Sequence, residues 1–133
     1  MKAVFADTFF FLAVLNPSDP AHNGSVELSR ALECPRVTTA WILTEVADAM
    51  SRRNHRAAFL DLLRFLETSP LVTIIPPSEG LFAKGIELFS KRPDKDWTLT
   101  DCISFVVMGD QGLSDALTGD QHFKQAGFNP MLI

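Results

Sequence analysis

The sequence has few cysteines and no surplus of positive charge. Its two cysteines, Cys34 and Cys102, lie far apart with no Cys-x-x-Cys or Cys/His spacing, which argues against a disulfide scaffold and against a zinc site. This composition suits a reducing compartment, and we expect a cytoplasmic protein. Twelve Lys and Arg residues against sixteen Asp and Glu give a formal net charge of -4, so no global field attracts polyanions and any role with nucleic acid must be local.

Long apolar runs are also missing. The strongest apolar run covers residues 9–15 and ends at Asn16-Pro17. Asp7 separates this run from the apolar residues before it. A membrane-spanning helix needs roughly 20 apolar residues, and a secretory signal would carry a small-residue cleavage site. We therefore expect neither a membrane span nor a signal peptide. The sequence also contains no repeat, low-complexity tract or linker.

The composition that is present fits one globular domain over residues 1–133. The chain has 133 residues, 47% of them apolar and 21% charged, which is enough for a single core. Short apolar runs alternate with longer amphipathic patterns, as in parallel strands joined by crossover helices, so the predicted class is α/β. The expected strands are 3–6, 37–39, 71–75, 116–118 and, at the sheet edge, 131–133. The expected helices are 8–15, a second that starts at 23–25, then 41–53, 57–66, 78–91, 98–108 and 121–126.

Acidic side chains follow two of the predicted strands. Asp7 comes directly after the first strand and Asp120 after the fourth. Asp101 lies in the first turn of the helix that precedes the fourth strand, and Glu45 lies in the second turn of the helix after the second strand. Because open parallel sheets bind ligands outside the carboxyl ends of their strands, all four side chains can face one crevice.

This set of acids has the chemistry of a metal site. Four converging carboxylates without basic partners would repel one another and raise their own pKa values unless a cation neutralises them. The set holds no Cys or His, and oxygen ligands select hard ions, so the expected cofactor is Mg²⁺ or Mn²⁺. Such an ion activates water and stabilises charge on a phosphate oxygen, which is the chemistry of a nuclease.

Each acid also has a structural explanation. The spacing of Thr98 and Asp101 is that of a capping box, and Asp7 and Asp120 each precede a helical pattern and can act as N-caps. Glu45 shares a helix face with neighbouring polar residues, as in a solvated stripe. The structural explanations are less convincing for the whole set than for each acid alone. They would require acids to follow two separate strands, and a third acid to lie on the helix between them, by coincidence.

The motifs around the acids resemble those of the PIN domain and, within it, of VapC-type toxins. The matching segments lie between Phe5 and Phe128: Ala6-Asp7-Thr8, Thr44-Glu45-Val46, Thr100-Asp101-Cys102, and Leu117-Thr118-Gly119-Asp120 with Phe123. The resemblance implies a three-layer α/β/α fold whose central parallel sheet has about four to five strands. It also implies that Asp7, Glu45, Asp101 and Asp120 form the metal-binding, catalytic pocket of an endoribonuclease, the toxin of a type II toxin–antitoxin pair.

Residues near the acids are candidates for supporting roles. Thr118 resembles the family's hydroxyl before the last acid, which would orient a carboxylate or the phosphate; the alternative is an ordinary strand threonine. Asp96 would either approach the pocket or remain a solvated loop acid, and we favour the loop. Trp97 would either stack on a base or form a partly buried lid, and we favour the lid. The three histidines show no metal-ligand spacing and are expected to be surface or structural residues: His22, His55 and His122.

The sequence also suggests partners. Arg52 and Arg53 lie in a dense basic cluster with His55 and Arg56 at the expected end of the Glu45 helix. They are candidates for contact with RNA phosphates or an antitoxin, and the alternative is solvated surface. The family pattern implies an RNA substrate, a homodimer and a small antitoxin protein lying in a groove. The apolar residues 9–11 fit either such a partner surface or the core.

Two other functions use parts of the same pattern. A catalytically idle PIN-like module would keep the fold and bind a protein or RNA, but the intact acids argue against it. A phosphoryl-accepting receiver or phosphatase also has an acidic pocket above a parallel sheet. Here, however, the third strand ends in Pro76-Pro77 without an acceptor Asp, and Asp7-Thr8-Phe9 lacks a second Asp two positions on.

Overall fold

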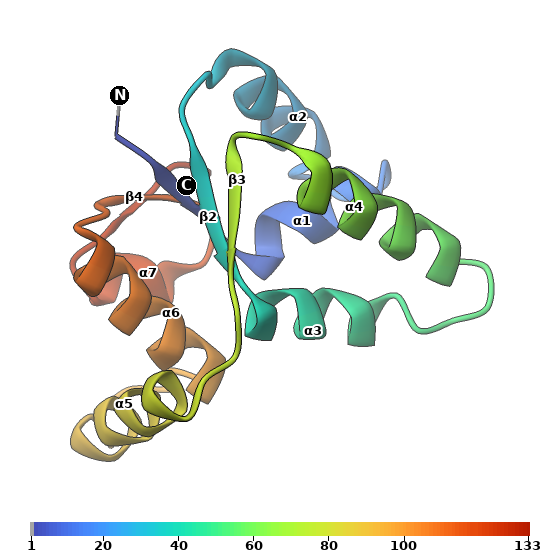
Figure 1. The fold of residues 1–133 in the computed structure, drawn as a ribbon. Coiled ribbons are helices and arrows are strands. Elements are labelled where there is room, and N and C mark those ends of the chain that lie inside the picture. Colours follow the sequence, from blue (N-terminus) through green and yellow to red (C-terminus); the bar gives the residue numbers. More distant parts are fainter. Residues whose placement is uncertain (1) are drawn as a thin grey trace.

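Five parallel strands lie between two layers of helices in the structure, a computed structural model that describes residues 2–133 (Figure 1). The strands are β1 (Val4–Ala6), β2 (Arg36–Thr39), β3 (Val72–Ile75), β4 (Asp115–Leu117) and β5 (Asn129–Pro130). The helices are α1 (Thr8–Leu15), α2 (His22–Ala31), α3 (Ala40–Ala49), α4 (Arg56–Thr68), α5 (Glu79–Lys91), α6 (Leu99–Gln111) and α7 (Gln121–Gln125). Helices α1 to α4 gather on one side of the sheet and α5 to α7 on the other, which confirms the predicted three-layer α/β/α class.

The strand order β3-β2-β1-β4-β5 fixes where a ligand can bind. Strand β1 pairs with β2 on one side, Val4 opposite Arg36, and with β4 on the other, Phe5 opposite Ala116. The chain steps outward from β1 to β3, returns through α5 and α6, and steps outward again from β4 to β5. The order therefore reverses beside β1, and the carboxyl ends of β1 and β4 flank the crevice that such sheets use for ligands.

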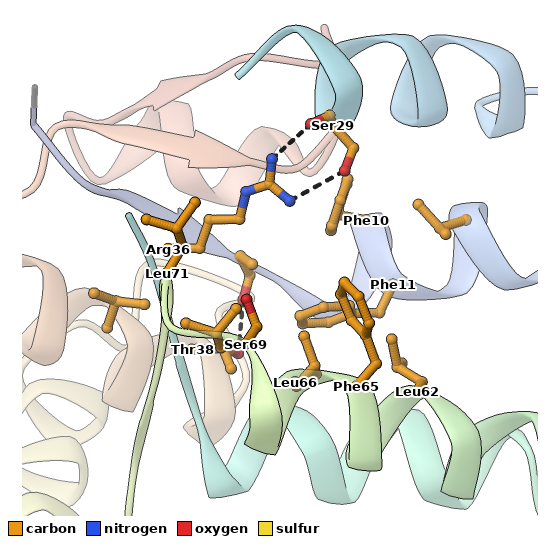
Figure 2. A pocket seen from close by; sticks show the side chains of 14 residues that line it. Phe10, Phe11, Ser29, Arg36, Thr38, Leu62, Phe65, Leu66, Ser69 and Leu71 are labelled. Atoms are coloured by element: carbon orange, nitrogen blue, oxygen red, sulfur yellow. Dashed lines mark hydrogen bonds between the residues drawn. The ribbon is translucent and has the colours of Figure 1, made fainter. Parts of the chain in front are cut away.

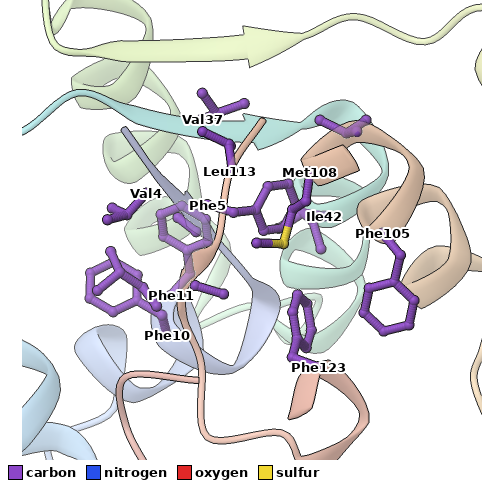
Figure 3. Packing of buried hydrophobic residues seen from close by; sticks show 14 of the residues in the cluster. Val4, Phe5, Phe10, Phe11, Val37, Ile42, Phe105, Met108, Leu113 and Phe123 are labelled. Carbon is purple, nitrogen blue, oxygen red and sulfur yellow. The ribbon is translucent and has the colours of Figure 1, made fainter. Parts of the chain in front are cut away.

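Aromatic packing anchors the short helix α7 beneath this crevice (Figure 3). The ring of Phe123 is fully buried, with its centroid 6.2 Å from that of Phe5 on β1 and 5.0 Å from that of Phe105 on α6. Full burial of such a side chain contributes about 1.5–3 kcal/mol. A helix of five residues has little stability of its own, so this contact holds the start of α7 in place.

Two boundaries differ from those expected. Helix α3 ends at Ala49 rather than at residue 53, because the Ser51 hydroxyl donates to the Ala47 carbonyl, one of the acceptors that a continuing helix would use. Arg52 and Arg53 therefore lie in the α3–α4 loop and not on the helix.

The edge strand is also misplaced in the sequence prediction, since β5 is Asn129–Pro130 and not 131–133. Gly127 adopts a φ of 93° after α7, a backbone conformation that favours glycine, and turns the chain back beside β4. The Asn129 amide then donates to the Ser114 carbonyl at 2.8 Å. Pro130 has no amide hydrogen and is tolerated because the strand is an edge.

None of the helices in residues 2–133 is long and apolar enough to cross a membrane.

Candidate metal centre

Asp7 is a buried carboxylate at the carboxyl end of β1. It is the N-cap residue of α1, but its side chain makes no capping hydrogen bond. Its Oδ2 instead accepts a hydrogen bond from Thr118 Oγ1 at 2.7 Å, and only 5% of the residue is exposed. Burial raises the pKa of Asp7 from 3.8 to about 7; hydrogen bonds from Thr118 and Thr8 oppose the shift, and the charges of Asp101 and Asp120 add to it.

The segment after β4 brings the next acid to the same place. Thr118 is fully buried, and its hydroxyl accepts a hydrogen bond from the Asp120 amide at 3.1 Å while it donates to Asp7. The hydroxyl therefore links the ends of β1 and β4 and fixes the direction of the Asp7 carboxylate. Asp120 is the N-cap of α7, and its Oδ1 accepts from the His122 amide at 2.9 Å.

Asp101 is a helix cap whose carboxylate also contacts His122. It forms a capping box with Thr98 at the start of α6. The Oδ2 atom of Asp101 accepts a hydrogen bond from the Thr98 amide at 3.1 Å, and the Oγ1 atom of Thr98 accepts one from the Asp101 amide at 3.0 Å. The same Oδ2 lies 2.9 Å from Nδ1 of His122. The capping carboxylate therefore also contacts the first turn of α7, which follows Asp120.

His122 is the residue that the sequence prediction missed. It is partly buried beside two acids, with Nδ1 2.9 Å from Asp101 Oδ2 and 3.6 Å from Asp120 Oδ1, and is not a surface residue remote from the site. Burial alone would lower the pKa of His122, but the hydrogen bond that it donates to Asp101 and the charges of Asp120, Asp101 and Asp96 outweigh this effect and raise the pKa. The available signal was its position two residues after Asp120, in the first turn of a helix that starts at the crevice.

Glu45 joins the cluster through a neighbour of Asp7. Thr8 Oγ1 donates to Glu45 Oε1 at 2.5 Å, which links the second turn of α3 to the start of α1. The side chain is half-buried, whereas Asp48 one turn further along is exposed. The atoms that gather most closely are ligand atoms of Asp101, Asp120 and His122, within 4.8 Å of one another. Neither Glu45 nor Asp7 belongs to this group.

Two other candidates lie at the border of the site. Asp96 is exposed in the loop before α6, as expected, and acts on the cluster only through its charge. Trp97 is 6% exposed, donates from Nε1 to Gln125 Oε1 at 3.0 Å, and carries the Arg92 guanidinium 5.0 Å from its ring centroid. Its ring is therefore the buried lid that we favoured and has little free face for a base.

The donor set fits a hard divalent cation. Among the residues that the structure describes, no Lys or Arg forms an ion pair with any of the four acids. Each acid accepts a hydrogen bond on one oxygen, from Thr118, Thr8, His122 or the His122 amide, and these donors fix the carboxylates. Oriented carboxylate oxygens at the end of a buried strand are the ligands that Mg²⁺ and Mn²⁺ prefer.

An apolar cavity of about 230 Å³ lies elsewhere, between α1, α4, β2 and β3 (Figure 2). Phe10, Phe11 and Leu66 line it, and Arg36 closes one side with its guanidinium bonded to Ser29. Phe10 and Phe11 are each 4% exposed, so these two belong to the core rather than to the surface. None of the four acids lines this cavity.

Comparison with known proteins finds likeness over nearly the whole chain. The family model of the PIN domain matches residues 4–129. The 23S rRNA-specific endonuclease VapC20 of Mycobacterium tuberculosis is 27% identical over 126 residues, which cover 94% of this chain and 95% of that protein.

Two solved structures have a similar fold. The crystal structure of Mycobacterium tuberculosis VapC20, a Sarcin-Ricin loop cleaving toxin, gives a TM-score of 0.86 at 24% identity and covers 94% of this chain and 95% of that one. The crystal structure of FitAcB from Neisseria gonorrhoeae gives a TM-score of 0.67 at 22% identity and covers 96% of this chain and 97% of that one.

Proposed function

The chain belongs to the PIN domain family, and from this premise we propose that it is a metal-dependent endoribonuclease, the toxin of a type II toxin–antitoxin pair. The similarity to VapC20, an endonuclease specific for 23S rRNA, supports RNA as the substrate class. The observation that carries the proposal is Asp7, a buried carboxylate that the Thr118 hydroxyl links to the backbone of Asp120 and that has no Lys or Arg partner within the described residues.

In the proposed mechanism, Asp7, Glu45, Asp101 and Asp120 would hold Mg²⁺ or Mn²⁺. An ion bound there would supply acidity to a water molecule and positive charge to the phosphate. Thr118 keeps one Asp7 oxygen hydrogen-bonded, which fixes the direction of that carboxylate. Thr8 does the same for Glu45. Asp7 must be ionised to bind the ion, so affinity for the metal is expected to rise as the pH rises through about 7.

The experiment that tests this function measures cleavage of an end-labelled structured RNA by the purified chain. We expect cleavage with Mg²⁺ or Mn²⁺, none in excess EDTA, and full recovery when the divalent ion is restored. Cleavage that continues in excess EDTA would contradict the metal-dependent mechanism. Absence of cleavage under all metals, together with retained RNA binding, would favour the idle PIN-like module instead.

The basic α3–α4 loop gives a second prediction. Arg52 and Arg53 are exposed and form no ion pair within the described residues, so their charges are free for a phosphate backbone. We expect R52A/R53A to weaken RNA binding at low salt and to reduce the slope of log affinity against log salt by about 0.7 per lost phosphate contact. The matched control is R30A/R64A, which removes two exposed arginines from α2 and α4. If the two double variants bind RNA with equal affinity, the α3–α4 loop does not contact RNA specifically.

A homodimer and an antitoxin protein are part of the proposal. Exposed apolar side chains, Phe65 at 65% and Phe89 at 50% among them, leave surface that partners of this kind can cover. Light scattering measures the first association, and co-purification from the native host measures the second. We place the activity in the cytoplasm, where RNA is accessible and where the two buried cysteines stay reduced.

A further inference from the structure

The side chain of His122 connects two of the acids from its place in α7. Its Nδ1 is 2.9 Å from Oδ2 of Asp101 and 3.6 Å from Oδ1 of Asp120. Its own backbone amide donates to that same Asp120 oxygen at 2.9 Å. One residue thus contacts the carboxylate at the start of α6 and the carboxylate at the start of α7.

The direction of the hydrogen bond between Nδ1 and Asp101 follows from the chemistry of the acceptor. An ionised carboxylate has no proton to donate, so Nδ1 must carry the hydrogen whether the imidazole is neutral or charged. Nδ1 is then occupied as a donor and is not free to bind a metal ion. The neutral ring keeps its lone pair on Nε2, the opposite nitrogen.

We propose that His122 is a positioning residue, which orients the Asp101 carboxylate for a divalent cation through its Nδ1–H donor, while its backbone amide holds the neighbouring Asp120 carboxylate. The inference rests on the proposed function and adds to it a residue outside the four acids. Partners of metal-binding carboxylates fix the direction in which the free oxygen points, and their loss typically reduces metal affinity about 10–100-fold. Thr118 and Thr8 stand in the same relation to Asp7 and Glu45, and His122 gives Asp101 a side-chain donor in addition to the Thr98 amide.

The alternative is that His122 binds the ion itself through Nε2, and two substitutions separate the roles. Asparagine can place an amide N–H near the position of Nδ1, whereas glutamine reaches toward the position of Nε2. H122N therefore keeps the donor to Asp101 and loses the Nε2 ligand. H122Q keeps a polar group near Nε2 and loses the donor.

The test is calorimetric titration of the purified chain with Mn²⁺ at about pH 8, above the pKa of Asp7. We expect H122A and H122Q to bind Mn²⁺ about 10–100-fold more weakly than the wild type and H122N to stay within about threefold of it. The control is H22A, which removes another partly buried histidine whose Nδ1 lies 2.7 Å from a carbonyl, that of Ala13. H22A should bind Mn²⁺ like the wild type. Melting curves in EDTA identify any variant that has not folded. Wild-type affinity in H122N would also show that the loss of affinity in H122A does not come from misfolding.

Three results would overturn the inference, and they differ in what else they affect. Unchanged Mn²⁺ affinity in H122A would show that His122 does not position the acids. Affinity kept in H122Q and lost in H122N would make His122 a ligand. If the wild type binds no divalent ion at all, the proposed function falls together with this inference.

Discussion

Asp7→Asn should make the metal-free protein more stable and at the same time remove its nuclease activity. The asparagine keeps nearly the shape of Asp7, and its amide oxygen can still accept the hydrogen bond from Thr118. What disappears is a buried negative charge next to two others. Since burial raises the pKa of Asp7 from 3.8 to about 7, ionising it in the folded protein costs about 1.4 kcal/mol for each of roughly three pKa units.

The sign of the pH dependence follows from the same shift. Between about pH 4 and pH 7 the folded protein holds a proton on Asp7 that the unfolded chain has already released. The free energy of unfolding of the metal-free wild type should therefore fall as the pH rises through this interval and level off above it. The D7N variant lacks this group and should lose this part of the pH dependence.

Urea unfolding in EDTA at about pH 5 and about pH 8 measures both effects. We expect D7N to exceed the wild type by a few kcal/mol at the higher pH and by less than half as much at the lower one. D48N is the matched control, because Asp48 is an exposed carboxylate on α3 and its neutralisation should change little. A D7N variant that is less stable than the wild type at about pH 8 would contradict the description of Asp7 as an uncompensated buried charge.

Asp101→Asn should reduce cleavage as severely as D7N but without the gain in stability. We expect both variants to lose more than about 100-fold in RNA cleavage, because even the partners of metal ligands are worth about 10–100-fold. The stability effects differ because Asp101 has favourable contacts that Asp7 lacks, with the Thr98 amide and with His122. A negative charge at the start of α6 stabilises the helix by about 0.3–1 kcal/mol. Loss of this stabilisation in D101N offsets the stability gained when repulsion between the acids is relieved.

D101A provides the comparison. It removes the oxygen that accepts from Thr98 and from His122, so it should be less stable than D101N by about 1 kcal/mol, the usual value of a capping interaction. Chemical denaturation in EDTA and single-turnover RNA cleavage with Mn²⁺ give the two readouts. If D101N cleaves RNA at the wild-type rate, Asp101 is only a helix cap and does not belong to the metal centre.

The strand ends were the most predictable part of the molecule. Short, fully apolar runs such as β1 favour buried strands, and parallel strands need crossover connections that are usually helices. The acids that follow β1 and β4 could therefore be assigned to one crevice from the sequence. The sequence could predict that the Thr118 hydroxyl makes a hydrogen bond near the acids, but not that Asp7 accepts it. That contact depends on the pairing of strands more than 100 residues apart in the sequence.

The missed features depend on side-chain geometry that local patterns do not contain. His122 has no second histidine at ligand spacing, so a search for metal-binding patterns passes over it, although α7 turns its ring toward Asp101. The position of β5 depends on the turn at Gly127, and residues 131–133 are as apolar as a strand. The early end of α3 depends on the Ser51 hydroxyl, whose hydrogen bond to the backbone competes with helix continuation.

Anomalous diffraction from crystals of the wild-type protein soaked in Mn²⁺ tests the metal centre most directly. At about pH 8, where Asp7 is ionised, we predict one strong manganese peak within coordination distance of carboxylate oxygens from Asp7, Asp101 and Asp120. The peak should vanish in D7N crystals soaked in the same way. A wild-type crystal that shows manganese only at surface carboxylates, or none at the crevice between β1 and β4, would contradict the assignment of these acids as the metal-binding site.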